Sequence, residues 1–207
     1  MIDLLEHINA IRRHVSRTGE DVSVLLTRSY GAPIEDVWDA LTDPERIRRW
    51  LMPITGELKI GGTFQLEGNA GGEILECEPP SRFKVTFGGP TSLVEVRLTA
   101  GAEDETTELK LNHTVPAELA GGGAGALYVG PGWDGALLGL ALYLAGETIG
   151  DPVAAANSPE LLRFSERSAR RRIAVVRESG TATEDELSAA TEASLAQFAP
   201  GVPSSES

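Results

Sequence analysis

The sequence predicts an α+β fold in which a curved antiparallel sheet wraps around a long helix, with extra helices at both ends. Short alternating apolar runs separated by turn residues extend from Thr55 to His113, which is typical of an antiparallel sheet with one buried face. A continuous apolar stripe at helical spacing follows Gly132. Strands and helices do not alternate along the chain, so a parallel βαβ sheet is not expected.

The first segment has the spacing of an amphipathic helix, which we expect over residues 1–20. The apolar residues that define its face are Leu4, Ile8, Ile11 and Val15. A strand is expected next, to about Tyr30, because Val22, Val24 and Leu26 alternate with their neighbours.

Two short helices should follow this strand. Pro33 suits the first turn of a helix that carries Val37 and Trp38. Asp43 is a candidate N-cap, and the proline after it begins a second helix that extends through Trp50.

The predicted sheet is a meander whose runs each place apolar residues on one face. These residues are Phe83, Val85 and Phe87, then Val94, Val96 and Leu98, and finally Leu109 and Leu111 with His113. A glycine-rich connector, Ala120–Gly125, leads to the long helix, whose stripe consists of Trp133, Leu137, Leu140 and Leu144. We expect this helix to pack on the apolar face of the sheet, which is a helix-grip arrangement.

Three parts are therefore predicted: the N-terminal helix over 1–20, a helix-grip domain over 21–150 and a helical extension over 151–207. In the extension, Ser158 begins an arginine-rich helix, and Thr183 with Glu186 has the spacing of a capping box. The tail from Pro200 is expected to fray. The helices of the extension either pack on the domain or form a homodimer interface.

Charge and cysteine content make several partners improbable. Eighteen Lys and Arg residues stand against 31 Asp and Glu residues, and the net charge of −13 disfavours nucleic acid, which is bound through cations. The longest apolar run, over 135–146, is shorter than the ~20 residues of a membrane-spanning helix. An unpaired Cys77 and an N-terminal segment without a secretion signal predict a cytoplasmic protein.

No metal and no cofactor are expected. His7 and His14 share one face of the predicted first helix, but no third ligand accompanies them, and His113 is in a separate segment. The glycine-rich connector lacks the lysine and hydroxyl residue of a phosphate-binding loop. Because no nucleophile motif surrounds Cys77, no catalytic residue is assigned.

Large apolar side chains are candidates to line a ligand pocket between the sheet and the long helix. They are Trp50, Phe64, Phe87, Trp133 and Leu137. The alternative is that they form an ordinary packed core. A pocket is favoured by the small residues of the long helix, such as Gly135, Ala136 and Gly139, and by the difficulty of filling a strongly curved sheet.

Two polar residues fall in phase with the buried face of the predicted sheet. His113 alternates with Leu111, and Glu73 alternates with Leu75 and Cys77. A carboxylate and an imidazole that face one cavity could orient a ligand or act as an acid–base pair. The alternative is that each has a structural hydrogen-bond partner, as buried polar groups normally do.

Several segments together resemble a known family. They are RSYGAPIEDVWDALTDPERIRRW over 28–50, GGTF over 61–64, GEILECEPPSRF over 72–83, LNH over 111–113 and GW over 132–133. In this order they resemble the SRPBCC (START/Bet v 1-like) superfamily, and within it the Activator of Hsp90 ATPase homologue 1-like family. The resemblance covers about Val22 to Gly146 and implies the helix-grip fold with a cavity for hydrophobic small molecules. It does not imply a chaperone role, because we do not expect the separate Hsp90-binding domain of the eukaryotic activator.

Three functions remain open. The first is binding of a hydrophobic small molecule, such as a lipid, an aromatic metabolite or a polyketide-like compound, which requires a cavity of at least ~300 Å³. The second is an enzyme, for instance a cyclase or hydrolase, with His113 or Glu73 as general acid or base. The third is a stress-related interaction module, which requires an exposed apolar stripe on the terminal helices.

Overall fold

The computed structural model describes residues 3–102, 105–147 and 150–202. Eight strands within these residues form one antiparallel sheet in the order β1-β2-β8-β7-β6-β5-β4-β3. The strands are β1 (Arg12–Thr18), β2 (Asp21–Tyr30), β3 (Ile54–Gly56), β4 (Thr63–Leu66), β5 (Gly71–Glu78), β6 (Arg82–Thr86), β7 (Leu93–Ala100) and β8 (Thr107–Pro116). The helices are α1 (Leu4–Asn9), α2 (Ile34–Thr42), α3 (Pro44–Trp50), α4 (Ala117–Ala120), the 3₁₀ turn η1 (Gly122–Gly125), α5 (Ala126–Leu144), α6 (Pro152–Ala156), α7 (Pro159–Ser179) and α8 (Glu184–Phe198).

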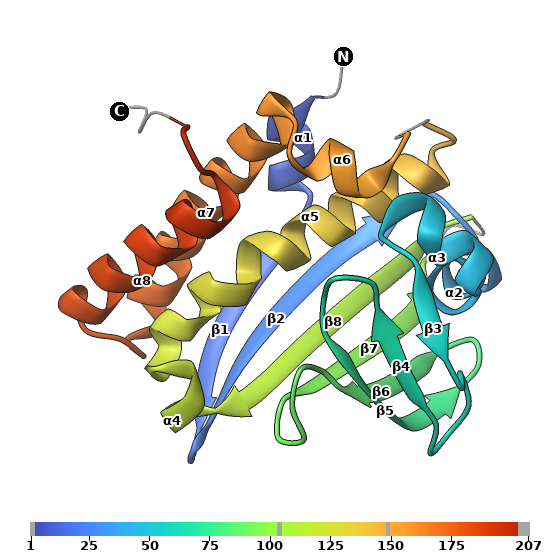
Figure 1. Ribbon diagram of the computed structural model, residues 1–207, viewed down its shortest axis with the longest axis horizontal. Helices are drawn as coiled ribbons and strands as arrows, with labels where there is room; N and C mark the ends of the chain where they lie inside the picture. The colour runs from blue at the N-terminus through green and yellow to red at the C-terminus, as the bar shows by residue number, and fades with distance from the viewer. Residues whose placement is uncertain (1–2, 103–104, 148–149, 203–207) are drawn as a thin grey trace.

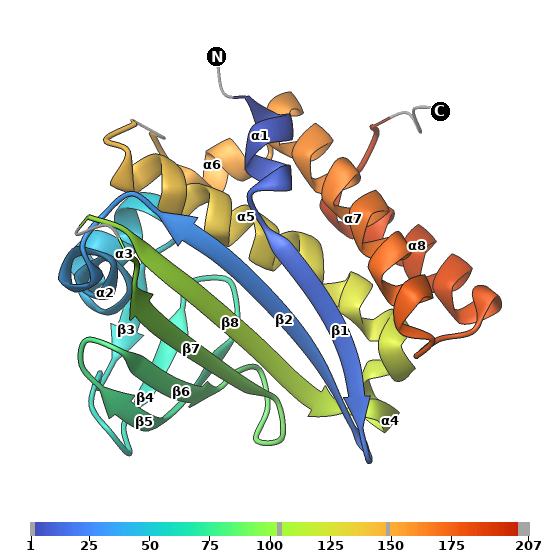
Figure 2. The same cartoon turned by 180° about the vertical axis from the view of Figure 1, so that it is seen from behind.

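The α+β helix-grip fold is confirmed. Helix α5 lies across one face of the sheet, and β3 and β4 curl around toward the same side (Figure 1). Seen from behind, the opposite face of β1, β2, β8 and β7 is in front of the helices (Figure 2). The core lies between the sheet and α5, where the apolar faces of β2, β7 and β8 meet the buried leucines of the helix.

The prediction of a helix over residues 1–20 is correct only for α1. The second half of this segment is strand β1, which pairs with β2 from Arg12↔Thr27 to Thr18↔Asp21. Ile11 and Val15 are four residues apart, and that spacing places them on one face of a helix and also on one face of a strand. Arg13, between them, buries its side chain on that face, so the apolar alternation of the strand is hidden.

The two short helices and the Asp43 cap of the second are confirmed. Helix α3 begins after Asp43, whose carboxylate accepts a hydrogen bond of 2.7 Å from the Glu45 amide. In the extension, Ser158 caps α7, and Thr183 and Glu186 form both halves of a capping box at α8. Such caps replace hydrogen bonds that the first helical turn lacks, so they are specified by local sequence.

The C-terminal helices pack on the rest of the chain. Helix α7 contacts α5 and β1, and α8 contacts α7 and α5. The large apolar side chains that the described residues expose lie outside α7 and α8: Leu5, Leu58, Ile60, Leu119, Tyr128 and, on α6, Val153. The exposed stripe that an interaction module needs is thus missing from the described parts of α7 and α8. Residues 203–207 of the predicted tail lie outside the described residues.

No helix in the described ranges is long and apolar enough to cross a membrane.

Candidate functional site

A cavity of about 380 Å³ lies between the concave face of the sheet, helices α2 and α3, and α5. Its volume exceeds the ~300 Å³ lower limit typical of small-molecule sites. The helices contribute Leu41, Thr42, Ile47, Trp50, Trp133, Ala136, Leu137 and Leu140. The strands and loops contribute Leu51, Ile54, Leu58, Lys59, Ile60, Phe64, Leu66, Ile74, Cys77, Pro79, Phe83, Val85, Phe87, Val94, Val96, Leu109 and Leu111.

Five of the seven residues predicted for the site line this cavity. They are Trp50, Phe64, Phe87, Trp133 and Leu137. Trp50 is at the end of α3 and donates its indole N–H to the carbonyl of Ala40 at 2.9 Å, which fixes the ring. Phe87 and Trp133 pack against each other with ring centroids 5.0 Å apart. Their role in binding stays a prediction.

His113 is buried as predicted, but it lies behind the cavity wall. The Trp133 indole N–H donates to Nδ1 of His113 at 3.0 Å, and Nε2 is 2.8 Å from the Ser92 hydroxyl. An Nδ1 that accepts a hydrogen bond leaves the proton of the neutral ring on Nε2, which therefore donates to Ser92. Burial lowers the pKa of His113 to about 4. The ring is neutral at pH 7 and positions Trp133.

The prediction that Glu73 faces the cavity is wrong. Glu73 is exposed to solvent, and Ile74 lines the cavity instead. The pairing of β5 with β6 shifts between Ile74 and Glu76, as in a β-bulge, and this shift also places Cys77 on the cavity wall. An extra residue in one strand reverses the alternation that follows it. Glu73 and His113 therefore do not form an acid–base pair.

The cavity wall offers a ligand few hydrogen-bonding partners. Among the described residues, Lys59 is the one charged residue that lines the cavity, and its side chain is mostly exposed at the mouth, 2.9 Å from Glu57. The indoles of Trp50 and Trp133 donate inside the protein, and the Thr42 hydroxyl donates to the Trp38 carbonyl at 2.8 Å. A charged or strongly polar group of a ligand would therefore lose its hydrogen bonds to water in the cavity and find no protein partner to replace them.

The mouth of the cavity is apolar as well. Leu58 and Ile60, in the loop between β3 and β4, both line the cavity and are 37% and 61% exposed. Helix α5 closes on α3 because Gly139 has no side chain: a Cβ there would lie 2.7 Å from the Trp50 carbonyl oxygen. The cavity therefore opens beside Lys59 and is closed where α3 meets α5.

Sequence reasoning missed some lining residues. Phe83, Val85, Val94, Val96, Leu109 and Leu111 were found through their alternation, which the structure confirms. Ile74 was missed because the bulge was not visible in the pattern, and Leu58 and Ile60 because a loop has no periodicity. The available sequence signal was the pair of large aliphatic residues on either side of Lys59.

This geometry agrees with one protein family. The family model for Activator of Hsp90 ATPase homolog 1-like protein matches residues 31–145, which include α2 through α5. The chain belongs to this family.

Solved structures extend this Activator of Hsp90 ATPase homolog 1-like assignment. The crystal structure of CalU16 from Micromonospora echinospora is 38% identical, with a TM-score of 0.66 over 81% of this chain and 98% of that one. Its solution structure gives 36% identity and a TM-score of 0.68, over 82% and 97% of the two chains. DynU16, described as a protein in the dynemicin biosynthetic locus, is 28% identical with a TM-score of 0.52, over 63% of this chain and 49% of that one. No curated protein matches the sequence.

Proposed function

We propose that this protein binds a neutral, hydrophobic small molecule in the cavity between the sheet and α5. One observation carries the proposal: about 380 Å³ of interior space has an apolar wall whose indole and threonine groups already donate elsewhere. Apolar contact is what such a wall offers, and burial of apolar surface contributes about 25 cal/mol per Å². The ligand would enter between Leu58 and Ile60.

The chemical class of the ligand is part of the proposal. The buried part of the ligand carries no charge, because a charged group there would lack a partner. A polar end can stay near Lys59 at the mouth. Lipids, aromatic metabolites and polyketide-like compounds have this shape, and the biosynthetic locus of DynU16 supports an intermediate or product of biosynthesis. We infer a cytoplasmic location, because Cys77 is unpaired and the N-terminal segment is charged.

A pair of fluorescent probes tests the proposal. N-phenyl-1-naphthylamine is neutral, and 1-anilinonaphthalene-8-sulfonate is the same ring system with a sulfonate. We expect the neutral probe to bind with one site per chain and the sulfonate to bind at least tenfold more weakly. The measurement is a fluorescence titration of the purified protein at pH 7.

Ala136→Phe locates the binding site, because Ala136 lines the cavity and a phenyl group there occupies ligand space. Ala193→Phe is the matched control, since Ala193 is exposed on α8. The first variant should weaken binding of the neutral probe at least tenfold, and the second should leave it unchanged. Equal binding by both variants, or preference for the sulfonate, would contradict the proposal; circular dichroism establishes that each variant is folded.

A further inference from the structure

A second cluster of polar side chains lies outside the cavity, where α1, β1, β2, α5 and α7 meet. We call it the arginine cluster: Arg13 of β1, Arg28 of β2, Arg172 of α7 and Asp134 of α5. None of these four residues lines the ligand cavity. Arg28 is 5% exposed, and Arg172 and Asp134 are fully buried. Figure 1 shows α1 and α7 next to each other above α5.

Asp134 is the acceptor at the centre of the cluster. Its Oδ2 accepts from Nε of Arg13 at 2.9 Å and from the Ser168 hydroxyl, and its Oδ1 accepts from Nη2 of Arg172 at 2.9 Å. Two guanidinium groups therefore share one carboxylate. The same Arg172 nitrogen is 3.3 Å from the Gly130 carbonyl oxygen, and Nη1 of Arg13 donates to the carbonyls of Ile8 and Ile11.

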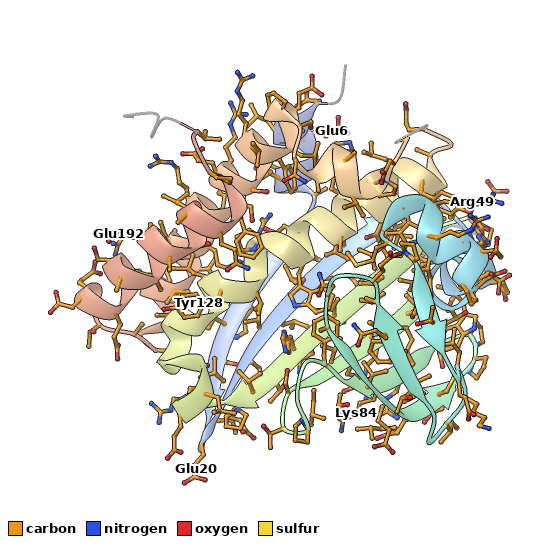
Figure 3. All side chains as sticks on the ribbon, in the orientation of Figure 1. Glu6, Glu20, Arg49, Lys84, Tyr128 and Glu192 are labelled. Atoms are coloured by element: carbon orange, nitrogen blue, oxygen red, sulfur yellow. The ribbon has the colours of Figure 1, made fainter. Side chains whose placement is uncertain are left out.

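The third guanidinium has no carboxylate partner among the described residues. Nη2 of Arg28 is 2.7 Å from Nδ1 of His7, and its guanidinium lies 5.5 Å from the ring centroid of Tyr30. The ring offsets part of the charge. Glu6, on α1, is exposed to solvent (Figure 3); its charge acts on Arg28, but the two side chains form no hydrogen bond.

Five buried nitrogens of the cluster make no hydrogen bond. They are Nη2 of Arg13, Nε and Nη1 of Arg28, and Nε and Nη1 of Arg172. Burial lowers the pKa of Arg28 and of Arg172, yet a guanidinium keeps its proton in proteins. Three buried guanidinium groups thus surround the single carboxylate of Asp134. Each of the three has at least one N–H group without a hydrogen-bond partner.

We propose that the arginine cluster binds a small oxyanion, a phosphate or a carboxylate, through the unpartnered nitrogens of Arg28 and its neighbours. An uncompensated buried charge is strongly unfavourable, and planar guanidinium groups match the oxygens of carboxylate and phosphate. The site is distinct from the hydrophobic cavity and does not depend on the proposed ligand. Because Ser168 and Arg172 belong to α7, the C-terminal extension completes it.

The test measures the thermal unfolding midpoint of the full chain against added sodium phosphate or sodium acetate, with sodium chloride at matched ionic strength as reference. An anion that binds only the folded protein stabilises it in proportion to ln(1 + [anion]/Kd). We expect a saturable rise with phosphate or acetate beyond that with chloride. The oxyanion with the larger effect shows whether the site prefers a phosphate or a carboxylate. Isothermal titration calorimetry with the same salt gives the stoichiometry.

Arg28→Met is the decisive variant, because it removes two unpartnered nitrogens and leaves the Asp134 bonds in place. It should weaken oxyanion binding at least tenfold and be no less stable than the original chain in chloride. Arg49→Met is the control, since Arg49 is exposed on α3, away from α1 and α7 (Figure 3). It should keep the full response.

Two results would overturn the proposal. One is the same midpoint shift with chloride as with both oxyanions in the original chain, with no calorimetric heat for either oxyanion. The other is an oxyanion response that Arg28→Met and Arg49→Met share with the original chain. The calorimetric arm uses the unaltered protein, so it decides the question even if Arg28→Met does not fold.

Discussion

His113 holds the Trp133 ring in place and is not itself free to bind a ligand, because both of its ring nitrogens already have partners inside the protein. Protonation would place a hydrogen on Nδ1, where the Trp133 indole donates, and would break that bond. The folded protein therefore favours the neutral ring, and the pKa of His113 lies at about 4, below the ordinary value of 6.5. Acid should loosen Trp133 and with it one wall of the cavity.

The titration of His113 should make the stability of the protein depend on pH. Because the folded-state pKa is lowered, His113 contributes stability that is present above pH 6.5 and is lost as the pH falls toward 4. Between pH 7 and pH 5 this amounts to about 2 kcal/mol of unfolding free energy. His113→Gln keeps an acceptor for Trp133 and a donor for Ser92 but does not titrate.

Urea unfolding at pH 7 and pH 5 measures the effect in both proteins. Between pH 7 and pH 5, the unfolding free energy of the variant should fall by about 2 kcal/mol less than that of the original chain. The pKa of His7 is also lowered by burial, but His7 is present in both proteins, so its contribution cancels. Equal losses in the two proteins would show that His113 does not titrate with the expected shift.

The sequence correctly predicted that His113 is buried, although not that it lies behind the cavity wall, and it placed Glu73 on the wrong face. The phase of β8 is regular from Leu109 to His113, so alternation was sufficient there. The alternation of buried and exposed residues in β5 changes at its bulge, and no residue type in the sequence indicates that change. The partners of His113 could not be predicted, because Ser92 and Trp133 come from other segments.

Helix α5 is longer at its N-terminus than its apolar stripe indicated. It begins at Ala126 and contains Pro131, which has no N–H to donate to the carbonyl of Leu127 four residues earlier. Helix α8 supplies a donor instead: the buried Ser194 hydroxyl is 2.7 Å from that carbonyl oxygen. The compensating hydroxyl comes from another helix, 67 residues from Leu127 along the chain, so the local sequence pattern does not indicate it.

Ser194→Ala tests this compensation. It leaves the buried Leu127 carbonyl without the hydroxyl donor, which should cost about 1–3 kcal/mol of unfolding free energy. Ser188→Ala is the matched control on the exposed side of α8 and should change stability little. Chemical denaturation of both variants makes the comparison. Similar stabilities for the two would mean that Ser194 does not support α5.

For the whole molecule, local signals were sufficient for the architecture apart from strand β1, which was predicted as helix, and they were insufficient for the polar core. The sheet, the helix caps and most of the cavity wall follow from periodicity and capping residues, which neighbours in sequence define. The arginine cluster joins β1, β2, α5 and α7, and its residues resemble surface charges in the sequence. Arg172 in particular belongs to the arginine-rich helix predicted after Ser158, yet its side chain is fully buried.

The space between the sheet and α5 should hold an apolar molecule. The most direct measurement is a crystal structure of the protein soaked with N-phenyl-1-naphthylamine. We predict density for the probe between Trp133, Phe64 and Leu137, with no charged side chain turned toward its rings. Density only on the protein surface, or side chains collapsed into the cavity, would show that this space does not take up an apolar molecule.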